Sequence, residues 1–125
     1  MQTFLFAGAV NAFIAVGLGA FAAHGLASHL DSGMLAVFKT GAEYQLNHAL
    51  ALLAVSLLLN IWPKQKLLLI SGWAFVAGAL IFPFSLYALA LTGIGALGAI
   101  TPIGGVAFLI GWACLAIFAI SKNTD

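Results

Sequence analysis

The feature that most constrains this chain is a stretch of 55 residues, 67–121, that contains no Asp, Glu, Lys, Arg or His. Crossing the hydrocarbon core of a bilayer takes about 20 helical residues, so this stretch is too long for one crossing and fits two. Gly93, Gly95, Gly98 and the Thr101-Pro102 pair interrupt it, because Gly disfavours a helix interior and Pro suits a first helical turn. The pattern therefore predicts two membrane spans, over residues 67–91 and 102–121.

The rest of the chain is similarly apolar. Residues 1–30 contain no Asp, Glu, Lys or Arg, and the apolar run 46–62 reaches span length when it is extended back to residue 42. Hydrophobic residues make up 64% of the 125 residues and charged residues 6%, whereas about a quarter of the residues in soluble domains are charged. We therefore predict an all-α integral membrane protein. Its single transmembrane domain is a bundle of four transmembrane helices over residues 3–24, 42–62, 67–91 and 102–121.

The lysines predict the orientation. With four spans, both termini and the turn at residues 63–66 share one side, and Lys64, Lys66 and Lys122 lie there. The positive-inside rule then places both termini in the cytoplasm. Residues 25–41 and 92–101 lie on the outer side. There, Asp31 or Ser32 can cap a short amphipathic helix over residues 33–40, which we expect to lie on the outer membrane surface.

Small residues recur at helical spacing in the first and fourth spans. Lipid removes the hydrophobic drive between helices, so helices associate where small side chains allow a close approach. We expect such packing contacts at Gly8, Ala15, Gly19, Gly104 and Gly111.

Most polar side chains of the predicted spans fall in the outer half of the membrane. An ionisable group on a membrane helix costs up to about 3 kcal/mol, so these groups should find partners close by. We predict one polar layer, structural or ligand-binding, made of His24, Glu43, Tyr44, Gln45, His48, Ser85, Tyr87, Thr92 and Thr101. Asn11, which lies nearer the inner side, is an exception to this layer.

Several chemistries could use this layer. A metal site could draw on the three His, Glu43 and Met34, but no two His have the three- or four-residue spacing of common ligand pairs. A serine hydrolase could use Ser85, His48 and Glu43. Ser85 has no nucleophile-elbow motif, however, and Glu43 and His48 point about 140° apart on a helix. We favour a structural reading and predict no catalytic residue, metal or cofactor.

Five strings carry a family resemblance: residues 17–26 (GLGAFAAHGL), 40–45 (TGAEYQ), 48–53 (HALALL), 85–93 (SLYALALTG) and 101–105 (TPIGG). The chain resembles the YgdD/YwdK family of small bacterial inner-membrane proteins, a domain of unknown function (DUF423) with a eukaryotic relative known as transmembrane protein 256. The resemblance covers nearly the whole chain and implies four membrane helices and no established activity. Asn47 and Pro83-Phe84 replace the aromatic residue and the Ser-Gly pair that are common in the family.

The leading hypothesis is a small polytopic protein of the bacterial inner (cytoplasmic) membrane, with a structural or interaction role in the cell envelope and no enzymatic activity. The alternative is a small oligomeric transporter or channel that uses His48 and Glu43 for protons or cations. A lipid-acting enzyme or a metal-binding protein is less favoured. Membrane lipids are the expected partners, together with a homo-oligomer. A net charge of +1 gives no basic stripe for nucleic acid.

Overall fold

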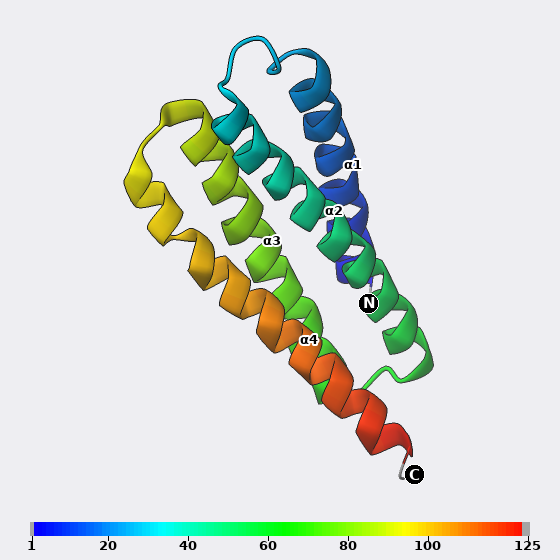
Figure 1. The fold of residues 1–125 in the computed structure, drawn as a ribbon. Helices are drawn as coiled ribbons and strands as arrows, with labels where there is room; N and C mark the ends of the chain where they lie inside the picture. Colours follow the sequence, from blue (N-terminus) through cyan, green and yellow to red (C-terminus); the bar gives the residue numbers. More distant parts are fainter. Residues whose placement is uncertain (1, 124–125) are drawn as a thin grey trace.

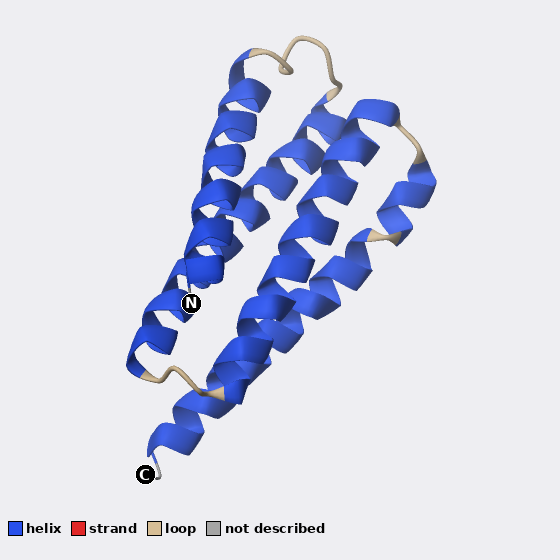
Figure 2. Ribbon diagram, turned by 180° about the vertical axis from the view of Figure 1, so that it is seen from behind, coloured by secondary structure: helices blue, strands red, loops and turns tan. Residues whose placement is uncertain are grey.

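The computed structural model describes residues 2–123, and these form four long helices. The helices are α1 (Gln2–His24), α2 (Ser32–Ile61), α3 (Lys66–Thr92) and α4 (Thr101–Asn123), and the short 3-10 helix η1 (Gly95–Ala99) precedes α4 (Figure 1). No strand occurs in this part of the chain (Figure 2). All four helices are long and apolar enough to cross a membrane. The predicted all-α class with four spanning helices is confirmed.

Helix α2 corrects one expectation. The separate outer helix predicted over residues 33–40 is wrong, because those residues are the first part of the continuous 30-residue α2. Gly41 does not end that first part. A Cβ atom at Gly41 would lie 2.8 Å from a ring carbon of Tyr87 on α3, so the residue is a packing position inside the helix. The Asp31 side chain caps α2 by accepting a hydrogen bond of 2.7 Å from the Met34 backbone N–H, as its residue type predicts.

The connection between α3 and α4 is more ordered than the predicted loop. Helix α3 ends at Thr92 and is capped by Gly93, whose φ of 71° is the left-handed conformation that favours glycine. Helix η1 then fills residues 95–99, and α4 starts at Thr101. Pro102 lies in the first turn of α4. Backbone N–H groups in a first turn have no acceptor within the helix, so the N–H that proline lacks costs α4 no hydrogen bond.

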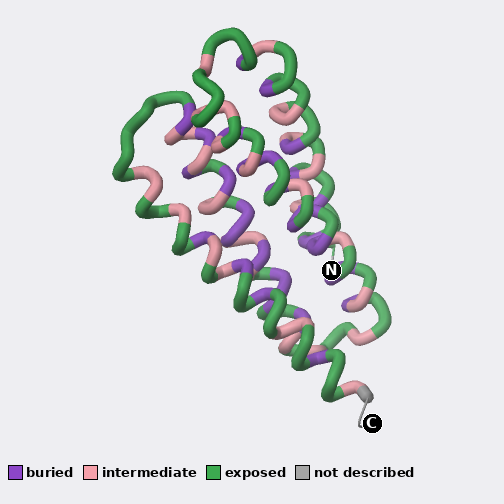
Figure 3. The backbone as a smooth tube through the Cα atoms, viewed as in Figure 1, coloured by how far each residue is buried: buried purple, intermediate pink, exposed green. Residues whose placement is uncertain are grey.

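The helices are arranged as an open row in sequence order. Each helix packs chiefly on its neighbours in the chain, so α2 and α3 lie in the middle and α1 and α4 at the two edges (Figures 1 and 3). In an apolar stretch of 18 residues, 44% of α2 and 39% of α3 is buried. The corresponding share is 22% in α1 and 22% in the segment Gly95–Lys122, which contains most of α4. Most of the surface of the two edge helices therefore faces outward, with apolar residues such as Phe13 and Leu109 exposed.

Two apolar clusters form the core. One lies toward the end with the α2–α3 turn and includes Phe4, Leu52, Leu68 and Phe75. The other lies toward the opposite end and includes Phe38 on α2, with Tyr87, Ala22 and Ala90. On α2, Gln45 and His48 lie between the residues of these clusters, and both are buried.

The predicted packing residues lie at two helix interfaces, with one exception. A Cβ atom at Gly8 would lie 2.8 Å from the Ala49 carbonyl oxygen on α2, and one at Gly104 would lie 2.5 Å from the Phe82 backbone nitrogen on α3. Gly111 on α4 lies equally close to the Phe75 ring on α3, and Ala15 is buried. Gly19 differs from these, because a Cβ atom there would reach its nearest neighbour only at 4.0 Å.

Candidate functional site

The first part of the buried polar site is a chain of hydrogen bonds that joins α1, α2 and α3. Gln45 is fully buried, and both ends of its amide have partners. Its Nε2 donates to Asn11 Oδ1 at 3.0 Å, and its Oε1 accepts from the Tyr87 hydroxyl at 2.6 Å. Asn11 in turn donates from Nδ2 to the Ala7 carbonyl at 2.9 Å. A buried amide with both ends bonded fixes the relative positions of the three helices that supply its partners.

The second part is His48, which joins α2 to α4. The Trp112 indole N–H donates to His48 Nε2 at 2.9 Å, and His48 Nδ1 lies 2.8 Å from the Tyr44 carbonyl oxygen. An indole nitrogen only donates, so Nε2 is the acceptor and the ring proton is on Nδ1, which donates to the carbonyl. Both ring nitrogens are therefore occupied within the chain.

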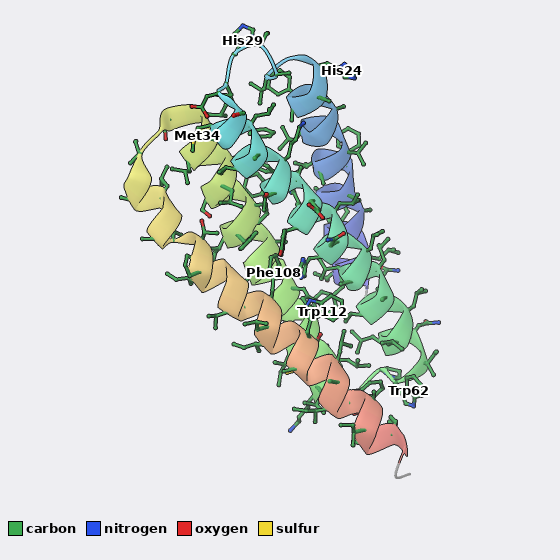
Figure 4. The ribbon with its side chains drawn as sticks, viewed as in Figure 1. His24, His29, Met34, Trp62, Phe108 and Trp112 are labelled. Atoms are coloured by element: carbon green, nitrogen blue, oxygen red, sulfur yellow. The ribbon has the colours of Figure 1, made fainter. Side chains whose placement is uncertain are left out.

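Aromatic rings surround the His48 imidazole. The Phe108 ring stacks on it, with centroids 3.5 Å apart and planes 10° from parallel. Phe75 and Trp112 lie at centroid distances of 5.6 Å and 5.7 Å, and Tyr44 lies at 6.2 Å. Phe108 and Trp112 lie midway along the molecule (Figure 4). These rings supply packing surface to the imidazole, and among them only Trp112 is found to bond it through a side chain.

A third part of the site joins α3 to α4. Ser85 Oγ lies 2.7 Å from Thr101 Oγ1 and donates to the Phe82 carbonyl at 2.8 Å. Ser71, nearer the start of α3, donates to the Gly111 carbonyl on α4 at 2.8 Å. Each of these bonds crosses or supports the interface where Gly104 and Gly111 bring the two helices close together.

The nine predicted layer residues are only partly brought together. Gln45 bonds Tyr87, Ser85 bonds Thr101, and Tyr44 stacks beside His48. His24, Glu43 and Thr92 are exposed. Thr92 bonds its own helix through the Ala88 carbonyl, and no hydrogen bond or ion pair joins His24 or Glu43 to another residue within 2–123.

The expectation that His24, Glu43 and His48 converge near the outer surface is wrong. His48 lies in the middle of α2, because the helix begins at Ser32 rather than near residue 42. His24 and His29 lie instead at the loop end of the molecule, well away from Trp112 (Figure 4). Glu43 is exposed whereas His48 is buried, as their separation of about 140° around the helix implies.

Neither the metal site nor the hydrolase triad assembles. No group of three or more His, Cys, Asp or Glu that could hold a metal ion occurs within the described residues. His48 Nε2 is bonded to Trp112 instead of to a serine, and Ser85 is bonded to Thr101 and Phe82. The geometry thus pairs each buried polar group with a structural partner.

Two important members of the site were missed from the sequence. Asn11 was set apart from the predicted layer, yet it follows Gly8 by three residues and precedes Ala15 by four, so it shares their buried face. That spacing could have identified it. Trp112 gives a weaker signal, because an indole N–H in an apolar span needs an acceptor but its spacing does not say which one.

Comparison with known proteins identifies the family. The model of the family "Protein of unknown function (DUF423)" matches residues 18–105. The chain is 44% identical over 120 residues to the UPF0382 membrane protein YwdK of Bacillus subtilis, covering 96% of this chain and 98% of that protein. It is also 44% identical to the UPF0382 membrane protein SSP2132 of Staphylococcus saprophyticus, covering 94% of this chain and 96% of that protein.

No solved structure matches the chain. The family match spans well over half of the chain, and the matched relatives are named membrane proteins. This agrees with the four apolar helices of the structure. The chain belongs to the DUF423 family of membrane proteins, a family of unknown function.

Proposed function

We propose that this protein is a non-enzymatic structural protein of the bacterial cell envelope, built around the polar network of Asn11, Gln45, Tyr87, His48 and Trp112. The observation that carries the proposal is the complete pairing of this network. Within residues 2–123, every buried side-chain nitrogen or oxygen has a hydrogen-bond partner. Catalytic and transport sites usually keep polar groups available for a substrate or ion, whereas each buried side-chain nitrogen and oxygen here already has a hydrogen-bond partner within the described residues.

The same geometry weighs against the transporter alternative. A proton or cation pathway through His48 and Glu43 would need both side chains to face one route. His48 is 5% exposed and is bonded at both ring nitrogens, whereas Glu43 lies on the exposed side of α2. The two residues therefore do not share a route within the described chain.

A flux assay separates the two functions. The protein is reconstituted into liposomes that hold a pH-sensitive dye, and a pH gradient is imposed. A structural protein should leave the decay of the gradient equal to that of protein-free liposomes. A faster decay that His48→Phe abolishes would overturn the proposal in favour of a proton pathway.

The proposed location is the bacterial cytoplasmic membrane, with both termini in the cytoplasm. Lys64, Lys66 and Lys122 on one side of the membrane support this orientation. Alkaline-phosphatase fusions test it, because the enzyme is active only outside the cytoplasm. We expect activity from a fusion after Thr92 and none from a fusion after Lys122, and the reverse pattern would refute the orientation.

A further inference from the structure

Three of the four lysines of the chain lie at the end of the molecule where α2 turns into α3. Lys64 is in the turn and Lys66 begins α3, and both are exposed. Lys122, near the end of α4, reaches the same place, because its amine lies 5.9 Å from the centroid of the Trp62 ring (Figure 4). A turn between two spanning helices lies at a membrane surface, so these lysines are at the level of the lipid headgroups.

No acid within residues 2–123 lies near these lysines. Asp31 caps the opposite end of α2, and Glu43 lies roughly 28 Å along that helix from Trp62. The third acid of the chain, Asp125, lies outside the described residues. This end of the molecule therefore attracts negative charge, as clusters of lysines beside membrane helices attract acidic lipids.

An open pocket lies at the same turn. It has a volume of about 340 Å³, and it is lined by Ile61, Trp62, Pro63, Lys64 and Gln65. Ile61 is the last residue of α2 and is exposed, whereas Lys64 lies in the turn. The pocket thus has an apolar wall on the membrane side and a cation on the water side, which is the order of groups along a phospholipid.

The Trp62 indole adds a hydrogen-bond donor to the pocket. Its ring packs edge-to-face on Phe118, with centroids 5.3 Å apart, and it carries the Lys122 amine over its face. No hydrogen bond of its Nε1–H is found within the described residues. Tryptophan is enriched at membrane interfaces because its apolar ring faces lipid while its N–H reaches a polar partner.

We propose that this pocket binds one anionic phospholipid of the membrane leaflet that it faces. The lipid phosphate lies between the Lys64 and Lys122 amines and accepts a hydrogen bond from the Trp62 indole. An acyl chain runs along Ile61 and Leu57, which are four residues apart on one face of α2 and are 63% and 68% exposed. The inference goes beyond the proposed structural role, and it holds for either orientation of the chain in the membrane.

The chemistry of the pocket favours an anionic lipid over two other occupants. A zwitterionic lipid brings an amine, which finds no acid here within the described residues and repels the lysines. A free phosphate would use the lysines, but it would leave the exposed side chains of Ile61 and Leu57 without a role. An anionic phospholipid uses both the basic and the apolar part of the surface.

Lipid titration followed by native mass spectrometry tests the pocket. The full chain in detergent is titrated with phosphatidylglycerol and, separately, with phosphatidylcholine that has the same acyl chains. We expect one phosphatidylglycerol to bind at least about tenfold more tightly, since each lysine beside an anionic headgroup contributes about fivefold. Lys64→Gln and Lys122→Gln should therefore each raise the dissociation constant of phosphatidylglycerol by about fivefold.

Two control variants separate the pocket from a general attraction between charges. Lys66→Gln makes the same charge change at the same end but outside the pocket lining, and Lys39→Gln makes it on the first part of α2. Each should raise the dissociation constant by about twofold or less, because salt screens exposed charges that make no direct contact. Equal losses in Lys64→Gln and Lys66→Gln would overturn the pocket in favour of diffuse attraction to the leaflet.

Two further results would also overturn the proposal. The first is phosphatidylcholine that binds as tightly as phosphatidylglycerol. The second is glycerol phosphate, which has no acyl chain, displacing phosphatidylglycerol at an equal concentration. That displacement would assign the lysines to a soluble anion instead of a lipid.

Discussion

The substitution Tyr87→Phe tests the polar network most directly. It removes one hydroxyl and keeps the ring, which packs on Phe38 at a centroid distance of 4.7 Å. The hydroxyl donates the 2.6 Å bond to Gln45 Oε1, and Gln45 is 0% exposed. The variant therefore leaves a buried carbonyl oxygen that water cannot reach.

The expected loss of unfolding free energy is about 1 to 2 kcal/mol. A buried polar group left without a partner costs about 1 to 3 kcal/mol. Hydrogen bonds between membrane helices average about 0.6 kcal/mol and reach about 1.7, because the unfolded chain in a membrane also finds partners. The complete burial of Gln45 favours the upper part of that membrane range.

The measurement is equilibrium unfolding in mixed micelles, followed by tryptophan fluorescence. Tyr44→Phe is the matched control, because Tyr44 is 41% exposed and its hydroxyl bonds no other described residue. It should change the unfolding free energy by less than about 0.5 kcal/mol. If Tyr87→Phe costs no more than Tyr44→Phe, the network does not stabilise the fold and our reasoning is refuted.

Two further substitutions probe the helix interfaces in the same unfolding assay. Trp112→Phe keeps a ring beside His48 but removes the indole N–H, and it should cost about 1 kcal/mol through the lost bond. An unchanged unfolding free energy would contradict that role. Gly104→Ala places a Cβ atom 2.5 Å from the Phe82 backbone nitrogen and should cost about 1 to 3 kcal/mol. Gly105→Ala is its control, since its nearest contact would be an ordinary 3.9 Å, and equal losses in the two variants would argue against a close approach.

The membrane helices were predictable because their signals are local. Long uncharged runs mark the helices, and Asp31 and Gly93 mark helix ends through their own side-chain and backbone properties. The start of α2 was not predictable in the same way. Gly41 interrupts the sequence pattern, but the Tyr87 ring packs against it from α3. That contact exists only in the tertiary structure, so a local pattern cannot reveal it.

The candidate site was predictable only within single helices. Glu43 precedes Gln45 by two residues, or about 200° around α2, so helical geometry alone could have separated the exposed acid from the buried amide. The partner of His48 could not be read in this way. Its bond to Trp112 depends on α4 lying close enough to α2 across α3, and that spatial order is not encoded in any spacing along the chain.

Helix α2 organises the open row, since it bonds all three other helices. Gln45 reaches α1 and α3, and His48, three residues further along the same face, reaches α4. Small residues permit close helix approach, but a neighbouring small residue one turn away would permit a shifted approach as well. Hydrogen bonds are more selective, because a shift of one turn, about 5.4 Å, separates a donor from its acceptor. The glycine contacts therefore set how close the helices lie, and the bonds of Gln45 and His48 set their register.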